Sequence, residues 1–223
     1  MEKHVVIIFP HPDDETFGTA GTAAKFRKQG VPVTYLCGTS GEMGRNMGLP
    51  LIANRETLAD IRKKELENAC RILDIELRML GYWDKTIEFE DKNEVASHIK
   101  NILDEIKPSL VITHYPGYAI HPDHNALGAA AIEAVQMMNP DERPKVWVQA
   151  INRDGMFTQE IGEPDIENDV TPFFDLKMKA IEAHASQAKG VLGYHKSEEK
   201  EDWEEIAKRS MGIESFYIWK FND

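Results

Sequence analysis

The segment His-Pro-Asp-Asp-Glu at residues 11–15 concentrates side chains that can bind a metal ion or move a proton. His11 and Asp14 are three residues apart across a turn, so both can face one point, whereas Asp13 should project differently. One imidazole and one carboxylate suit a hard-to-borderline divalent cation. A helix N-cap at Asp13 or Asp14, with His11 incidental, would explain the same residues. On this segment alone, the capping interpretation is the simpler one.

A second cluster, His-Pro-Asp-His at residues 121–124, again places two metal-capable groups three residues apart. A catalytic zinc site needs three protein ligands and one open position for water. His11, Asp14 and one histidine of the second cluster supply that number. Two such clusters therefore favour a metal site over two unrelated caps. The spacing does not decide between His121 and His124 as the third ligand.

Zinc held in this way lowers the pKa of its bound water to roughly 7 and polarises a carbonyl, which suits hydrolysis of an unactivated amide. The reaction also needs a base for the water and a group that stabilises the oxyanion. Asp13 is the candidate base because it is adjacent to the ligands but off their line. If His124 is the ligand, His121 is free to contact the oxyanion, and Asp123 could orient one of the imidazoles.

Both clusters follow segments that read as buried strands. Residues 5–9 form an apolar, β-branched run that leads into a helix at about 15–29, and residues 110–113 precede the second cluster and a helix at about 125–137. Strand and helix patterns alternate along the chain, as in βαβ units. We therefore expect an α/β fold with a Rossmann-like, mostly parallel sheet, helices on both faces, and the metal site at the carboxyl edge of the sheet.

A helix is expected over residues 55–73, and another over about 173–187. Arg62 and Glu65 share one face of the former by their i,i+3 spacing. Physics alone predicts an ion pair of small value on the helix surface. His184 is interpreted as a structural, hydrogen-bonding histidine.

The two clusters together resemble the LmbE/PIG-L family of zinc-dependent de-N-acetylases, and the match runs from the first strand to about residue 187. Flanking stretches are closer still to the subgroup that acts in bacillithiol biosynthesis; they are residues 41–48, 80–82, 85–90 and 115–118. The resemblance implies a single deacetylase domain over residues 1–223. It implies hydrolysis of the acetamide of an N-acetylglucosaminyl substrate, in this subgroup N-acetylglucosaminyl malate.

The resemblance also implies roles for individual residues. Zinc, one ion per chain, would be bound by His11, Asp14 and His124; Fe²⁺ accepts the same ligands. Asp13 would be the base, His121 would act at the transition state, and Asp123 would orient one of the imidazoles. The implied substrate contacts are Arg62, Glu42 and Tyr118. From their positions in the sequence, Arg45, Arg55 and Arg153 are also expected near the carboxyl edge. Arg45 is the candidate contact for the malate carboxylates, and a solvated loop charge is the alternative for it.

The composition of the chain disfavours some classes of binding partner. The formal net charge of −12, with no basic tract, disfavours nucleic acid and anionic membranes. No run of 18 apolar residues exists, and Cys37 and Cys70 read as buried thiols, so we expect a cytoplasmic protein. The partner that the resemblance implies is a small amino-sugar glycoside, and a homo-oligomer is left open.

Several alternatives also stay open. They are an amidase for bacillithiol S-conjugates, a deacetylase for another N-acetylated amino sugar, and a catalytically silent metal-binding protein. A dinucleotide-binding protein is disfavoured because Gly-x-Gly-x-x-Gly is absent after the first strand.

Overall fold

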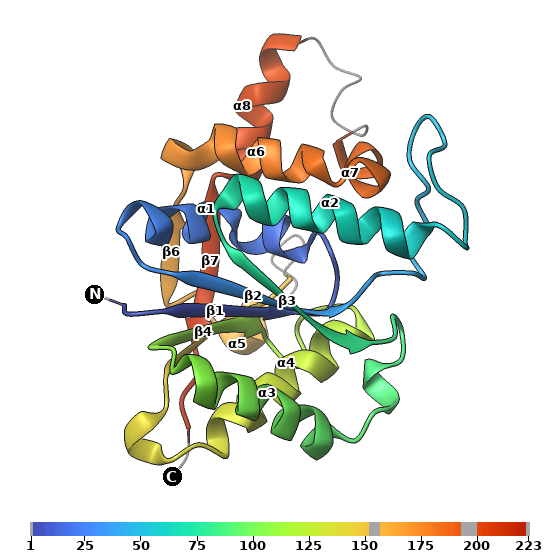
Figure 1. Cartoon of the computed structure of the whole chain (residues 1–223). Helices are drawn as coiled ribbons and strands as arrows, with labels where there is room; N and C mark the ends of the chain where they lie inside the picture. The colour runs from blue at the N-terminus through green and yellow to red at the C-terminus, as the bar shows by residue number, and fades with distance from the viewer. Residues whose placement is uncertain (1, 152–156, 193–199, 222–223) are drawn as a thin grey trace.

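Seven strands form one sheet in the order β3-β2-β1-β4-β5-β7-β6 (Figure 1) in the computed structural model, which describes residues 2–151, 157–192 and 200–221. The strands are β1 (Val5–Phe9), β2 (Val33–Thr39), β3 (Glu76–Tyr82), β4 (Leu110–His114), β5 (Lys145–Gln149), β6 (Ile166–Asp169) and β7 (Ile213–Ile218). β1 to β5 pair in parallel, and β7 runs antiparallel to both β5 and β6. The expected mostly parallel sheet is confirmed.

Helices cover both faces of the sheet (Figure 1). They are α1 (Asp14–Lys28), α2 (Leu58–Leu73), α3 (Lys92–Ile106), α4 (Pro122–Gln136), α5 (Thr158–Ile161), α6 (Phe174–Ala183), α7 (Ala185–Leu192) and α8 (Lys200–Met211), with short 3-10 turns at Ile87–Phe89, Pro140–Glu142 and Thr171–Phe173. α1, α2 and α6 pack on one face, and α3 and α4 pack on the other. No helix in the described parts of the chain is long and apolar enough to span a bilayer.

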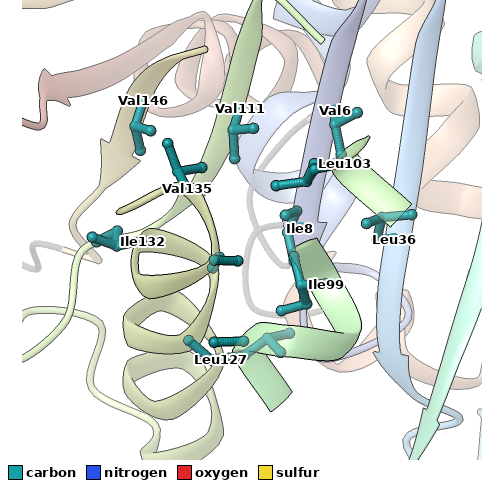
Figure 2. Close-up of a cluster of buried hydrophobic side chains, with 14 of the residues drawn as sticks. Val6, Ile8, Leu36, Ile99, Leu103, Val111, Leu127, Ile132, Val135 and Val146 are labelled. Carbon is teal, nitrogen blue, oxygen red and sulfur yellow. The ribbon is translucent and has the colours of Figure 1, made fainter. Parts of the chain in front are cut away.

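The first strand shows why the sheet is buried on both sides. All five residues of β1 are fully buried. Val6 and Ile8 point into the cluster that contains Ile99 of α3 and Leu127 of α4 (Figure 2), whereas Ile7 belongs to the opposite cluster. Successive side chains of a strand alternate between faces, so an uninterrupted apolar run is what two covered faces require. Each such side chain contributes about 1.5–3 kcal/mol of burial energy.

The two chemical clusters meet because β1 and β4 are neighbours. From β1 the chain proceeds to β2 on one side, and from β4 it proceeds to β5 on the other, so the strand order reverses between them. A crevice opens at such a switch point outside the carboxyl ends of the strands, where α/β proteins bind ligands. Residues 11–14 follow β1, and residues 121–124 follow β4, at this edge.

Three helix boundaries differ from expectation. α4 begins at Pro122 rather than residue 125, because proline suits the first helical position and the His121 side chain caps the helix by accepting from the Asp123 backbone N–H. α2 begins at Leu58 instead of residue 55. The helix expected over residues 173–187 is divided at His184, which ends α6 before α7 starts.

Candidate metal centre

Three side-chain groups converge at the switch point. His11 Nδ1 lies 3.1 Å from His124 Nε2. The Asp14 carboxylate places Oδ2 3.4 Å from His11 Nδ1 and Oδ1 3.3 Å from His124 Nε2. Ligands at bond lengths of about 2.0–2.1 Å from a tetrahedral zinc ion are about 3.3 Å apart. The triangle therefore has the size that a bound zinc ion requires.

Each imidazole is oriented by the nitrogen that does not face this triangle. His124 Nδ1 donates to the backbone carbonyl of Ala119 at 3.1 Å, which leaves the lone pair on Nε2. His11 Nε2 lies 3.2 Å from Asp84 Oδ1 and 3.4 Å from Asp123 Oδ2, so a carboxylate accepts its proton and leaves the lone pair on Nδ1. Partners of this kind fix the tautomer of metal-binding histidines.

The electrostatics of the cluster also suit a cation. Burial alone would lower the pKa of His11, but the carboxylates of Asp123, Asp14 and Asp84 raise it well above its usual value. Burial alone would raise the pKa of Asp14, but the imidazoles of His124 and His11 hold it well below its usual range. Both shifts show that the site stabilises positive charge beside an ionised carboxylate. The donor set, its spacing and its charge thus fit a divalent metal ion.

Asp13 stands beside the triangle without belonging to it. Its backbone is left-handed (φ 103°), a conformation that non-glycine residues rarely adopt. The Asp13 N–H donates to Glu15 Oε2 at 3.0 Å, and Arg62 Nη2 donates to Asp13 Oδ2 at 3.1 Å. Burial raises the pKa of the Asp13 carboxyl to about 6. The Arg62 guanidinium opposes this increase, and the negative charge of Asp14 adds to it. The turn explains why adjacent aspartates point differently.

The expected surface ion pair between Arg62 and Glu65 is wrong. Both side chains are buried, and each faces a separate partner. Arg62 binds Asp13 and the backbone carbonyls of the two loops around it, while Glu65 accepts from the N–H and hydroxyl of Ser186 at 2.7 and 2.6 Å. Tertiary contacts override the i,i+3 geometry because burying either charge requires strong hydrogen bonds.

His121 caps α4 and faces the same cavity. Its Nδ1 accepts from the Asp123 N–H at 3.1 Å, so the neutral ring carries its proton on Nε2. Burial, aided by the imidazoles of His11 and His124, lowers the pKa of His121. The ring lies 4.8 Å from that of His11, centroid to centroid. A neutral imidazole here presents one hydrogen-bond donor close to the metal-binding groups.

Sequence reasoning missed three members of the site. Asp84 is buried and contacts His11. In the sequence, the one feature that could have indicated Asp84 is its position just after the end of β3. His114, at the end of β4, stacks on His124 with ring centroids 4.1 Å apart. Burial, followed by the neighbouring His124 imidazole, lowers the pKa of His114 well below its usual value. Glu15 also pairs with the buried His184 at 2.6 Å, which gives that structural histidine its partner.

The site opens into a cavity of about 440 Å³, within the range typical of small-ligand sites. Its walls carry the metal-capable groups with Asp13, His121, Arg62, Arg45 and Lys85. Glu42 and Tyr118 do not line it. A Glu42 oxygen accepts from the Asp84 N–H, and the Tyr118 ring packs on Tyr115. Arg153 lies outside the described residues.

A family model described as "PIG-L: GlcNAc-PI de-N-acetylase" matches residues 6–135. That range, more than half of the chain, contains the whole candidate site. It begins in β1 and ends in α4, so it includes both of the strand ends that carry the clusters.

Two bacterial relatives and one solved structure extend the comparison. A Bacillus cereus protein named "Probable N-acetyl-alpha-D-glucosaminyl L-malate deacetylase 2" is 51% identical over 86% of this chain and 87% of its own. A Bacillus subtilis (strain 168) protein of the same name is 46% identical over the full length of both. The N,N'-diacetylchitobiose deacetylase from Pyrococcus horikoshii has a TM-score of 0.73 at 28% identity, over 98% of this chain and 84% of that one.

Proposed function

Because this chain belongs to the PIG-L family of de-N-acetylases, we propose that it hydrolyses the acetamide of N-acetyl-α-D-glucosaminyl L-malate, releasing acetate and glucosaminyl malate. The chain is a deacetylase, a hydrolase of amide C–N bonds. The names of its Bacillus relatives contain this malate glycoside as the substrate, and its deacetylation is a step of bacillithiol biosynthesis. The observation that carries the proposal is the triangle of metal-binding atoms with the separate carboxylate of Asp13 beside it in one cavity.

His11, Asp14 and His124 would hold the metal ion. Zinc is proposed, because two imidazoles and one carboxylate with a free fourth position form a catalytic zinc set; Fe²⁺ accepts the same ligands. When bound, the ion lowers the pKa of water and polarises the amide carbonyl. Asp84 and Asp123 would hold His11 in the tautomer that binds it.

Asp13 would take the proton of the attacking water. Its carboxylate lines the cavity, and its left-handed turn aims it away from the ligand triangle. Arg62 restrains the same carboxylate through Oδ2. After the C–N bond breaks, the proton can be returned to the departing amine by the same carboxyl group. A fixed acid–base group of this kind contributes about 10²–10⁴-fold to the rate.

His121 would donate a hydrogen bond from Nε2 to the oxyanion that develops on the acetamide oxygen. The α4 backbone fixes this tautomer by donating to Nδ1, so the donor is in place before the reaction starts. We assign His121 this role rather than metal binding because its Nδ1 accepts a hydrogen bond, so Nε2 carries the ring proton and has no lone pair for a metal ion.

Product analysis with N-acetylglucosaminyl compounds tests the proposal. The zinc-loaded protein should release acetate from the malate glycoside faster than from free N-acetylglucosamine or a neutral glycoside. Preference for a bacillithiol S-conjugate or for another amino sugar would transfer the assignment to those substrates. Absence of turnover on the entire panel, with metal bound, would instead support a silent metal-binding protein.

We further propose that the protein works in the cytoplasm. The support is that Cys37 and Cys70 are both free, buried thiols, as expected in a reducing compartment.

A further inference from the structure

Three cationic side chains line the cavity, and two of them have no charged partner among the residues that the structure describes. Arg62 is buried and donates to Asp13 and to the carbonyls of Gly41 and Pro12. Arg45 and Lys85 are exposed. Within the described residues, neither side chain has a hydrogen-bond or ion-pair partner. Two unpaired cations therefore face the candidate metal site in a chain whose net charge is −12.

The Lys85 backbone is hydrogen-bonded to a carboxylate that orients His11. Its backbone is left-handed (φ 66°), and its N–H donates to Asp123 Oδ2 at 2.7 Å. The preceding residue, Asp84, contacts His11 through its carboxylate. One of the two carboxylates that orient His11, that of Asp123, thus also holds the Lys85 backbone. The ammonium extends from this fixed point on a flexible stem, so it can reach a group bound in the cavity.

Arg45 belongs to a second loop that is joined to the first. The Met43 N–H donates to Asp84 Oδ2 at 2.9 Å, and the Asp84 N–H donates to Glu42 Oε1 at 2.8 Å. Arg55 Nη1 donates to the carbonyl of Gly44 at 2.7 Å, immediately before Arg45. These bonds hold both loops at the same cavity, so Arg45 and Lys85 are presented together.

We propose that Arg45 and Lys85 form a subsite for the two carboxylates of a dicarboxylic aglycone. The proposal rests on the proposed function, in which that aglycone is malate. The cavity wall also contains Asp13, Asp14 and Asp84, which repel a dianion. Arginine matches a carboxylate with its planar fork, and lysine supplies a point charge. A neutral sugar has no need of either cation, so the pair selects for the charged aglycone.

Charge-removing variants of both residues test the subsite. Arg45→Gln and Lys85→Met keep side-chain bulk and remove the charge, while Lys85→Arg keeps the charge. Lys64→Ala is the matched control, since Lys64 is an exposed cation on α2 away from the cavity. Steady-state kinetics would compare the malate glycoside with methyl N-acetylglucosaminide, and the ratio of their kcat/KM values is the readout.

Each charge-removing variant should lower that ratio by about tenfold, mainly through KM for the malate glycoside, as expected for loss of a charge-assisted hydrogen bond. The double variant should lose most of the preference, whereas Lys85→Arg and Lys64→Ala should retain it. Raising the salt concentration from about 50 to about 500 mM should raise KM for the malate glycoside in the wild type more than in the double variant.

The results separate the two proposals. If the wild type prefers the malate glycoside and the charge-removing variants keep that preference, the subsite is overturned and the function stands. If the wild type does not distinguish the two glycosides, the malate assignment and the subsite are both overturned. Equal losses on the two substrates would also overturn the subsite, because they would show a role unrelated to the aglycone.

Discussion

Replacing Asp13 by asparagine should separate metal binding from catalysis. Asparagine has nearly the same shape, tolerates the left-handed backbone at φ 103°, and can still accept a hydrogen bond from Arg62. The ligand triangle of His11, Asp14 and His124 does not include residue 13, so metal content should remain at one ion per chain. The amide cannot take a proton from water, and the chemical step should therefore lose its base.

The expected loss is about 10²–10⁴-fold in kcat, which corresponds to about 2.7–5.5 kcal/mol of transition-state stabilisation. The free energy of unfolding should change by less than about 1 kcal/mol, because Arg62 keeps its bonds to Gly41 and Pro12. Acetate release, metal analysis by mass spectrometry and chemical denaturation measure the three quantities. Glu67→Gln removes one exposed carboxylate on α2, outside the cavity wall, and serves as the control for charge alone.

Two results would refute this reasoning. Loss of the metal in Asp13→Asn would show that Asp13 is a ligand and that the turn does not separate the two aspartates. A loss in kcat of less than about tenfold, with metal retained, would place the general base elsewhere.

Three further predictions follow from the buried polar groups. His124→Ala should strongly reduce bound metal, and a stoichiometric ion in that variant would contradict the ligand assignment. Lys177→Met should destabilise the fold by about 3–5 kcal/mol in urea denaturation, because Lys177 and Glu214 form a fully buried pair 2.8 Å apart and Glu214 would keep an unpaired charge; a change below about 1 kcal/mol would contradict this. Burial opposes protonation of His184, but the Glu15 carboxylate raises its pKa above 6.5. The pair should therefore stabilise the zinc-loaded protein fully below pH 6.5, and this contribution should be lost as the pH rises through the raised value. Denaturation at pH 6.5 and 9 should show a larger difference for the wild type than for His184→Gln, and equal differences would remove this source of pH dependence.

The sequence by itself determined the features that depend on nearby residues. A short, β-branched apolar run that ends at prolines, such as residues 5–9, predicts a strand covered on both faces, and alternating strand and helix patterns predict a mostly parallel sheet. The convergence of His11 and Asp14 is also local, since three residues across one turn bring both to the same point. The PIG-L resemblance was carried by the same two short motifs, and the comparisons confirm it.

Only the tertiary structure decided which groups join from distant parts of the chain. The spacing does not distinguish His121 from His124. At the start of α4, His121 accepts from a backbone N–H, whereas His124 faces His11, from which it is 113 residues distant in the sequence. Asp84 carried no motif and joins the site because β3 ends at the same edge of the sheet.

The same reasoning explains the wrong prediction for Arg62 and Glu65. Their helical spacing favours a pair worth a few tenths of a kcal/mol, whereas their burial makes stronger hydrogen bonds to Asp13 and Ser186 necessary. A local pattern predicts a contact only when no packed neighbour offers a better one. Such neighbours are set by strand order and helix packing, which bring together residues that the sequence keeps far apart.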